Sequence, residues 1–146
     1  MSIDKKTGDI KISNEIKINK NTSKIEVENI ENIEKYGNIN GYETYSIKDT
    51  TFLNLKMRIN FRFKDNYLFK IELIWTDGKV NISGYNVTNL DLSNEKEYLS
   101  NKISQAVEEL AEITTTYEDC FSFPWGYILI KADQKSLSCL IDIIYK

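Results

Sequence analysis

Between Leu53 and Trp75 the sequence alternates apolar and polar residues with a period of two, and the alternation breaks only once. The break is the polar stretch 64–66, which separates apolar positions ending at Phe63 from those beginning at Tyr67. A period of two is typical of a strand with one buried face. The segment therefore predicts an antiparallel hairpin in which Phe63 lies opposite Tyr67.

This register gives every inward position an apolar partner. The predicted pairs are Phe61 with Phe69, Ile59 with Ile71, Met57 with Leu73, and Leu55 with Trp75. On the outward face the same register sets Arg58 opposite Glu72, a favourable pair of opposite charges. A slip of one residue would turn the apolar side chains toward water, so the alternation fixes which face is buried.

Two further strands extend the hairpin into a meander. Residues 42–47 predict a strand before it, and the Asp77-Gly78 step after it is typical of a two-residue hairpin turn that would place Trp75 opposite Val80. The result is a four-stranded antiparallel meander from Tyr42 to Val87, with one apolar face to be covered.

The segment after the meander predicts a long amphipathic helix over residues 94–114, about 30 Å in length. Ser93 is a suitable N-cap, and Glu95 and Glu97 lie in the first turn, where the helix dipole favours acids. The apolar stripe that would cover the sheet consists of Leu99, Ile103, Ala106, Val107, Leu110, Ile113 and Thr114.

The two ends of the chain complete the predicted fold. Residues 10–18 predict a strand, either continuous or broken at Ser13-Asn14, and the capping-box pair Ser23 and Glu26 predicts a short helix over residues 24–33. At the other end, residues 127–132 and 137–145 predict a hairpin with Ala132 facing Leu137. We therefore expect one α+β domain over residues 1–146, an antiparallel sheet of meander plus C-terminal hairpin packed against one long amphipathic helix, with a short N-terminal helix.

Several residue types needed for catalysis, metal binding or phosphate binding are absent or unfavourably placed in the sequence. The chain contains no histidine, which removes the usual catalytic triads and most zinc sites. The glycines do not form a phosphate-binding loop, and Glu108 with Glu112 would lie on an exposed ridge instead of across a cleft. In the predicted hairpin Cys139 faces Ile130, which leaves Cys120 out of reach, so we expect two reduced thiols. We predict no catalysis, cofactor or metal.

No apolar run approaches the roughly 18 residues that a membrane span needs. The first apolar residues are also diluted by charges, unlike those of a signal peptide. We expect a cytoplasmic protein without a membrane partner.

An acidic run is the first candidate for function. Five acids and no lysine or arginine occur between Glu108 and Asp119. Such a run can be a solvated helix face, or a surface complementary to a basic partner such as a nuclease. On the second interpretation the partner-binding residues are Glu97, Asn101, Glu108, Glu112, Tyr117, Glu118 and Asp119.

A basic sheet face is the second candidate. Between Lys48 and Lys70 there are six basic and two acidic residues, with Lys56, Arg58 and Arg62 on the outward face of the central strand. Such a face could bind phosphates, or simply be solvated. Because it lacks the aromatic pair of an RNA-binding sheet, nucleic acid is not the expected partner and a nucleic-acid or regulatory binding module is the alternative function.

The C-terminal sequence resembles a known family. The run 123–128, the turn 133–136 and the closing stretch 141–145 look like the final hairpin of small immunity proteins of bacterial contact-dependent growth inhibition and other polymorphic toxin systems. Residues 53–73 are similar to a strand pair of several such proteins. The resemblance implies a single-domain, non-catalytic bacterial antitoxin of the cytoplasm. Its partner would be one cognate toxin domain, often a nuclease, whose active site or substrate access it blocks. It implies no contact residues, so the seven above rest on charge and position.

Overall fold

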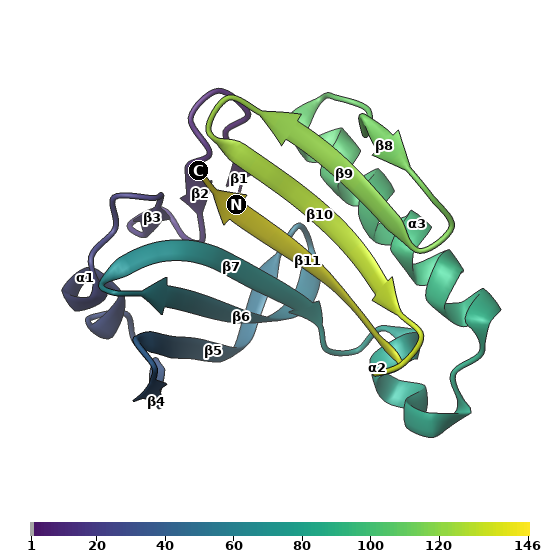
Figure 1. Cartoon of the computed structure of the whole chain (residues 1–146), viewed down its shortest axis with the longest axis horizontal. Coiled ribbons are helices and arrows are strands. Elements are labelled where there is room, and N and C mark those ends of the chain that lie inside the picture. Colours follow the sequence, from purple (N-terminus) through teal and green to yellow (C-terminus); the bar gives the residue numbers. More distant parts are fainter. Residues whose placement is uncertain (1) are drawn as a thin grey trace.

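An eight-stranded antiparallel sheet organises the computed structural model, which describes residues 2–146 (Figure 1). Its strand order is β4-β5-β6-β7-β11-β10-β9-β8. The strands are β4 (Glu34–Ile39), β5 (Tyr42–Phe52), β6 (Leu55–Lys64), β7 (Tyr67–Trp75), β8 (Ile113–Thr114), β9 (Glu118–Phe123), β10 (Gly126–Asp133) and β11 (Ser138–Tyr145). With one long helix on the sheet, the predicted α+β class is confirmed.

The central hairpin has the predicted faces along β6 and in the second half of β7, but its register is different. Asp65 and Asn66 both have positive φ and form a two-residue turn, so Lys64 rather than Phe63 lies opposite Tyr67. An irregularity after Arg62 then shifts the pairing. The observed pairs are Phe61 with Ile71, Ile59 with Leu73, and Met57 with Trp75. Because this shift is by two residues, the buried face of β7 is as predicted from Ile71 onward. Beside the turn the shift is by one residue, so Leu68 is buried opposite Phe63, whereas Tyr67, predicted to be inward, is 75% exposed and Phe69 is only half-buried.

The Asp77-Gly78 step does not turn the chain into a fourth meander strand, so that prediction is wrong. The chain continues as α2 (Lys79–Ser83) and the 3-10 turn η1 (Gly84–Asn86). The Trp75 indole N–H donates to Asp77 Oδ1 at 2.7 Å, and the Val80 N–H donates to Glu95 Oε1 at 3.2 Å. The free edge of β7 is instead paired with β11.

The long helix α3 (Asn89–Val107) begins and ends earlier than predicted. Thr88 and Asp91 form a capping box at its start, so Ser93 is not the N-cap. Its buried face includes the predicted Leu99, Ile103 and Val107. Glu108 ends the helix with a left-handed φ of 55°, and the predicted last turn is replaced by a loop and β8.

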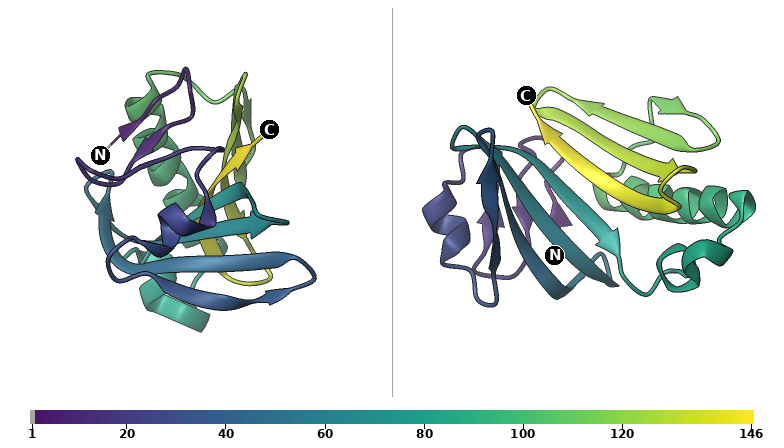
Figure 2. Two further views of the ribbon diagram at one scale, coloured as in Figure 1. Left: turned by 90° about the vertical axis from the view of Figure 1, so that its left-hand side faces the viewer. Right: turned by 60° about the horizontal axis from the view of Figure 1, so that its bottom comes forward.

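The N-terminal segment covers the part of the core face that α3 leaves open (Figure 2). It contains β1 (Ser2–Ile3), β2 (Ile10–Lys11) and β3 (Lys17–Ile18), so the predicted strand over 10–18 is two short ones. The Ser23 and Glu26 capping box is confirmed, but α1 (Lys24–Glu28) stops before the predicted end at Ile33. Lys24 and Glu28 contact Glu43 and Tyr45, which places α1 over β5.

The C-terminal hairpin forms as predicted, with Ala132 opposite Cys139 instead of Leu137. Both thiols are free, as predicted; Cys139 is buried and Cys120 is half-buried. The hairpin also binds the N-terminal segment: the Trp125 indole N–H donates to the Lys5 carbonyl at 2.9 Å and the Tyr145 hydroxyl to the Gly8 carbonyl at 3.0 Å. Within residues 2–146, no helix has both the length and the apolar character of a membrane span.

Candidate functional site

The exposed side of α3 carries Glu97, Asn101, Ser104 and Glu108 at spacings of four, three and four residues. These intervals place the four side chains on one stripe of the helix. Glu97, Asn101 and Glu108 are exposed, as the sequence predicts for a partner-binding face.

The chain then turns back beside α3 through residues 108–118, which we call the acidic segment. Ser104 fixes its start, because its hydroxyl donates to the Glu109 carbonyl at 2.5 Å. Two large apolar side chains project from it into solvent, Leu110 at 86% exposure and Ile113 at 58%. Glu108, Glu109 and Glu112 are exposed neighbours of these two in sequence. The acidic segment therefore combines carboxylates with uncovered apolar surface.

A groove of about 480 Å³ lies between α3 and the acidic segment. Its lining is Lys96, Glu97, Ser100, Asn101, Ser104, Leu110, Ala111, Thr114, Asp119 and Phe121. Leu110 also borders a second depression of about 570 Å³, lined by Ser104, Gln105, Glu108 and Glu109. Three of the predicted partner-binding residues, Glu97, Asn101 and Asp119, thus line one groove, and Glu108 lines the depression beside it.

Asp119 is not a surface acid, because its side chain is buried in the wall of the groove. Its Oδ1 lies 2.8 Å from Lys96 Nζ, and its Oδ2 accepts a hydrogen bond from the Ser100 hydroxyl at 2.5 Å. Asp119 alternates with Phe121 and Phe123 on β9, so the period of two already indicates an inward position. Lys96 and Ser100, the two partners, were not predicted.

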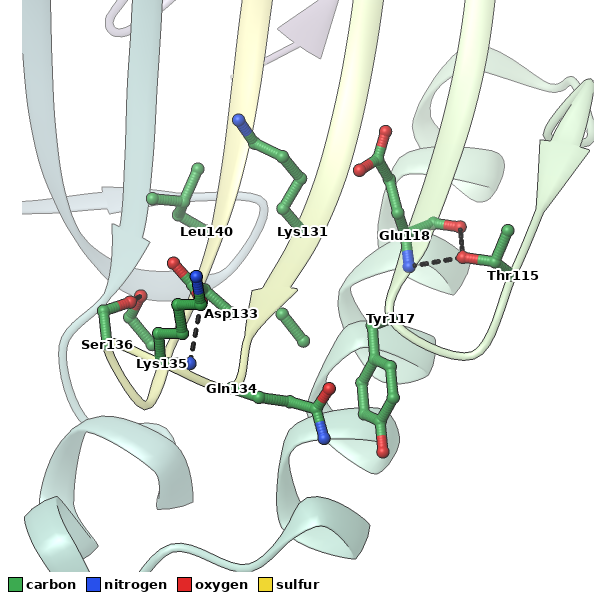
Figure 3. Close-up of a pocket in the computed structure, with 11 residues that line it drawn as sticks. Thr115, Tyr117, Glu118, Lys131, Asp133, Gln134, Lys135, Ser136 and Leu140 are labelled. Carbon is green, nitrogen blue, oxygen red and sulfur yellow. Dashed lines mark hydrogen bonds between the residues drawn. The ribbon is translucent and has the colours of Figure 1, made fainter.

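Tyr117 and Glu118 lie away from the groove and line a pocket of about 600 Å³ beside the turn between β10 and β11 (Figure 3). Tyr117 is half-buried, and the Glu118 N–H donates to the Thr115 hydroxyl at 3.0 Å. Lys131, across from Glu118 in the sheet register, extends along the same pocket. The seven predicted residues therefore do not form one site: Glu97, Asn101 and Asp119 line the groove, Tyr117 and Glu118 line this pocket, and Glu108 and Glu112 line neither.

The basic sheet face is internally paired to a large extent. Arg62 and Lys70 both contact Glu72, at 3.1 and 2.9 Å, and Lys48 contacts Glu34 at 3.2 Å. Burial raises the pKa of Glu72, but the hydrogen bonds and positive charges of its neighbours outweigh burial and leave that pKa below its usual value. Glu72 stays ionised at neutral pH and offsets both cations.

Arg58 is not opposite Glu72, so that predicted pair is wrong. Its Nη2 donates to the Tyr36 hydroxyl at 3.1 Å, and its guanidinium lies 5.9 Å from the centre of the Tyr36 ring. The two-residue shift of the hairpin is the reason, because it places Asn60 opposite Glu72. On the outward face of β6, Arg58 is therefore paired with the ring of Tyr36.

Within residues 2–146, no group of three or more histidine, cysteine or acidic side chains is arranged to hold a metal ion. Comparisons of the chain with models of protein families, with curated proteins and with solved structures give no significant match.

Proposed function

We propose that this chain is a non-catalytic immunity protein that binds and neutralises a basic toxin domain in the bacterial cytoplasm. The observation that carries the proposal is the exposure of Leu110 and Ile113 in the middle of the acidic segment. The residue pattern that resembles the final hairpin of immunity proteins points the same way.

The combination of groups is suited to a protein partner. Apolar side chains at the centre of an interface contribute most of the affinity, while a charged rim selects the partner and speeds encounter. The exposed carboxylates around Leu110 and Ile113 would form such a rim. A nuclease domain fits this surface, since a groove that binds phosphates must itself be positive.

The first test is co-expression of the chain with the product of the gene immediately upstream of its own. A stable complex on purification, together with rescue of growth from that product's toxicity, is the expected result. Absence of both the complex and the toxicity would contradict the assignment of this pair as toxin and immunity protein.

The acidic segment is tested by reversing two of its charges, Glu108→Lys with Glu112→Lys. Both side chains are exposed, so the melting temperature should stay within about 2 °C, whereas affinity for the toxin should fall at least tenfold through slower association. Isothermal titration and stopped-flow binding measure these quantities. Glu15→Lys with Glu31→Lys, also exposed, is the matched control and should leave affinity unchanged. Equal affinity of both double variants would reject this surface and leave the function open.

The alternative, a nucleic-acid or regulatory binding module using the basic sheet face, has less support because Glu34 and Glu72 offset three of its cations, Lys48, Arg62 and Lys70. The two functions differ in how strongly binding affinity depends on salt concentration. Binding through phosphates weakens steeply with salt in proportion to the number of phosphates neutralised. A packed protein interface depends on salt less.

A further inference from the structure

We propose that the groove between α3 and the acidic segment receives an arginine side chain from the partner. This inference rests on the proposed function and adds to it the chemical group that the partner must present. The groove, of about 480 Å³, has enough room for one such side chain together with water.

The charge of the groove favours a cation. Glu97 and Asp119 line it with one lysine, Lys96, whose side chain is only 6% exposed. The Lys96 ammonium is already bound to Asp119 Oδ1 at 2.8 Å and to the Thr115 carbonyl at 2.9 Å. Glu108 and Glu112 add further negative charge beside the groove. An entering cation therefore meets a net negative surface.

The shape of the groove favours arginine over lysine. Leu110, Ala111 and Phe121 give it apolar walls, against which the aliphatic part of a long basic side chain can lie. Glu97 and Asn101 face it from successive turns of α3, with Cβ atoms about 6 Å apart. A planar guanidinium presents several N–H donors in a fixed fork and can reach both acceptors, whereas an ammonium is a compact point charge.

Both walls of the groove are held in place by hydrogen bonds. The Glu112 N–H donates to the Cys120 carbonyl at 2.8 Å, and the Ser104 hydroxyl fixes the Glu109 carbonyl. The buried contact of Asp119 with Lys96 and Ser100 ties β9 to α3 behind the groove. A site formed in advance loses less entropy on binding, because its own groups need not be ordered.

The groove can be tested without the toxin. The probe is N-acetyl-arginine methylamide, titrated into the 15N-labelled protein and followed by two-dimensional NMR, with the lysine and norleucine analogues as comparisons. We expect saturable shifts of the amides of residues 97–101, 110–114 and 119–121. The lysine analogue should bind several-fold more weakly, and the neutral norleucine analogue should give no saturable shift.

The variant Glu97→Gln with Asn101→Ala should weaken binding of the arginine probe at least threefold. Its matched control, Glu31→Gln with Asn94→Ala, makes the same chemical changes at exposed positions outside the groove and should bind as the wild type does. Shifts that are linear in probe concentration and spread over all surface acids would overturn the inference. The inference would also be overturned if the norleucine analogue bound as tightly as the arginine probe, or if the groove variant bound the arginine probe as tightly as the wild type does.

The complex with the toxin separates failure of the inference from failure of the proposed function. If the groove variant binds toxin as tightly as the wild type while the Glu108 and Glu112 reversals weaken the complex, the arginine inference is wrong and the immunity function stands. If the arginine probe binds as expected but neither a complex nor toxicity is found, the groove is a guanidinium site and the assignment of this pair as toxin and immunity protein is wrong.

Discussion

Two buried carboxylates, Glu95 on α3 and Asp119 on the neighbouring β9, have different hydrogen-bond partners. Asp119 faces the Lys96 ammonium and the Ser100 hydroxyl. Glu95, also buried, accepts a hydrogen bond from the Val80 backbone N–H. Burial raises the pKa of Glu95, and that single hydrogen bond does not offset it. Ionisation of Glu95 therefore lowers the stability of the folded state.

The Glu95→Gln variant should be more stable than the wild type at pH 7. Because the folded pKa of Glu95 lies above 4.5, the folded state holds its proton more tightly than the unfolded state. The contribution of Glu95 to stability is therefore most favourable below about pH 4.5 and is lost as pH rises through its folded pKa. Glutamine is neutral throughout and keeps an acceptor for Val80.

Urea unfolding of both proteins at pH 4 and pH 7 measures the effect. The difference in unfolding free energy should be clear at pH 7 and small at pH 4. Glu97→Gln, an exposed glutamate on the same helix, should change stability little at either pH. An equal gain for Glu95→Gln at both pH values would contradict a role for its ionisation.

For individual residues, the exposed acids of the site were predictable from the sequence, whereas the buried position and contacts of Asp119 were predictable only in part. A run of carboxylates without a cation is visible in the sequence, and Glu97, Glu108 and Glu112 are indeed exposed. The inward position of Asp119 follows from its alternation with Phe121. Its bond to Lys96 depends on where α3 lies against β9, which no local pattern specifies.

Among the elements, the end of α3 is held in an unfavourable conformation. Glu108 has a φ of 55°, a left-handed value that costs a residue with a Cβ about 1 kcal/mol relative to glycine. Glycine is the usual residue at this point of a helix. A glutamate there adds a carboxylate to the acidic segment at the expense of stability.

The Glu108→Gly variant should raise the unfolding free energy by about 1 kcal/mol. The same change removes one carboxylate from the proposed interface, so toxin affinity should fall. Thermal unfolding and isothermal titration measure the two effects separately. Glu109→Gly, at a neighbour without positive φ, should not stabilise the protein. A loss of stability in Glu108→Gly would contradict the strain argument.

The faces of the strands were predictable, whereas their registers and one turn were not. A shift of two residues leaves inward side chains inward, so the period of two identified the core of β6 and of β7 from Ile71 onward. Beside the turn the shift is by one residue, and Leu68 is buried there instead of Tyr67. The Asp77-Gly78 step is a strong hairpin signal, but β7 pairs with β11 on that side. Because β11 is distant from β7 in the sequence, the residues around Trp75 do not indicate that the two strands pair.

For the whole molecule, the contact between the N-terminal segment and the C-terminal hairpin contributes to the stability of the fold. Ile10 is buried, and the nearby Gly8 carbonyl accepts the Tyr145 hydroxyl. The ring of Trp125 lies directly against Gly8, where an added Cβ would be 2.5 Å from it. The N-terminal segment therefore covers aromatic side chains of the last hairpin.

The Ile10→Ala variant should lose about 2 to 5 kcal/mol of unfolding free energy, the usual cost of such a cavity. Loosening the N-terminal segment should also expose Trp125 and move tryptophan emission to longer wavelength below the main transition. Denaturant unfolding followed by fluorescence measures both. Ile25→Ala is the matched control, since Ile25 is 69% exposed and should cost little. Equal effects of the two variants would contradict the packing described for Ile10.

The place of β11 in the sheet has a consequence for synthesis of the protein. This strand lies between β7 and β10, yet it follows every other strand in the chain. A growing polypeptide therefore leaves the ribosome with two part-sheets whose facing edges have no strand between them. Unpaired edges of this kind associate readily with other chains. Translation that stalls before residue 138 would give a molecule unable to join its two part-sheets, so synthesis of residues 138–145 decides whether the earlier strands yield a folded product.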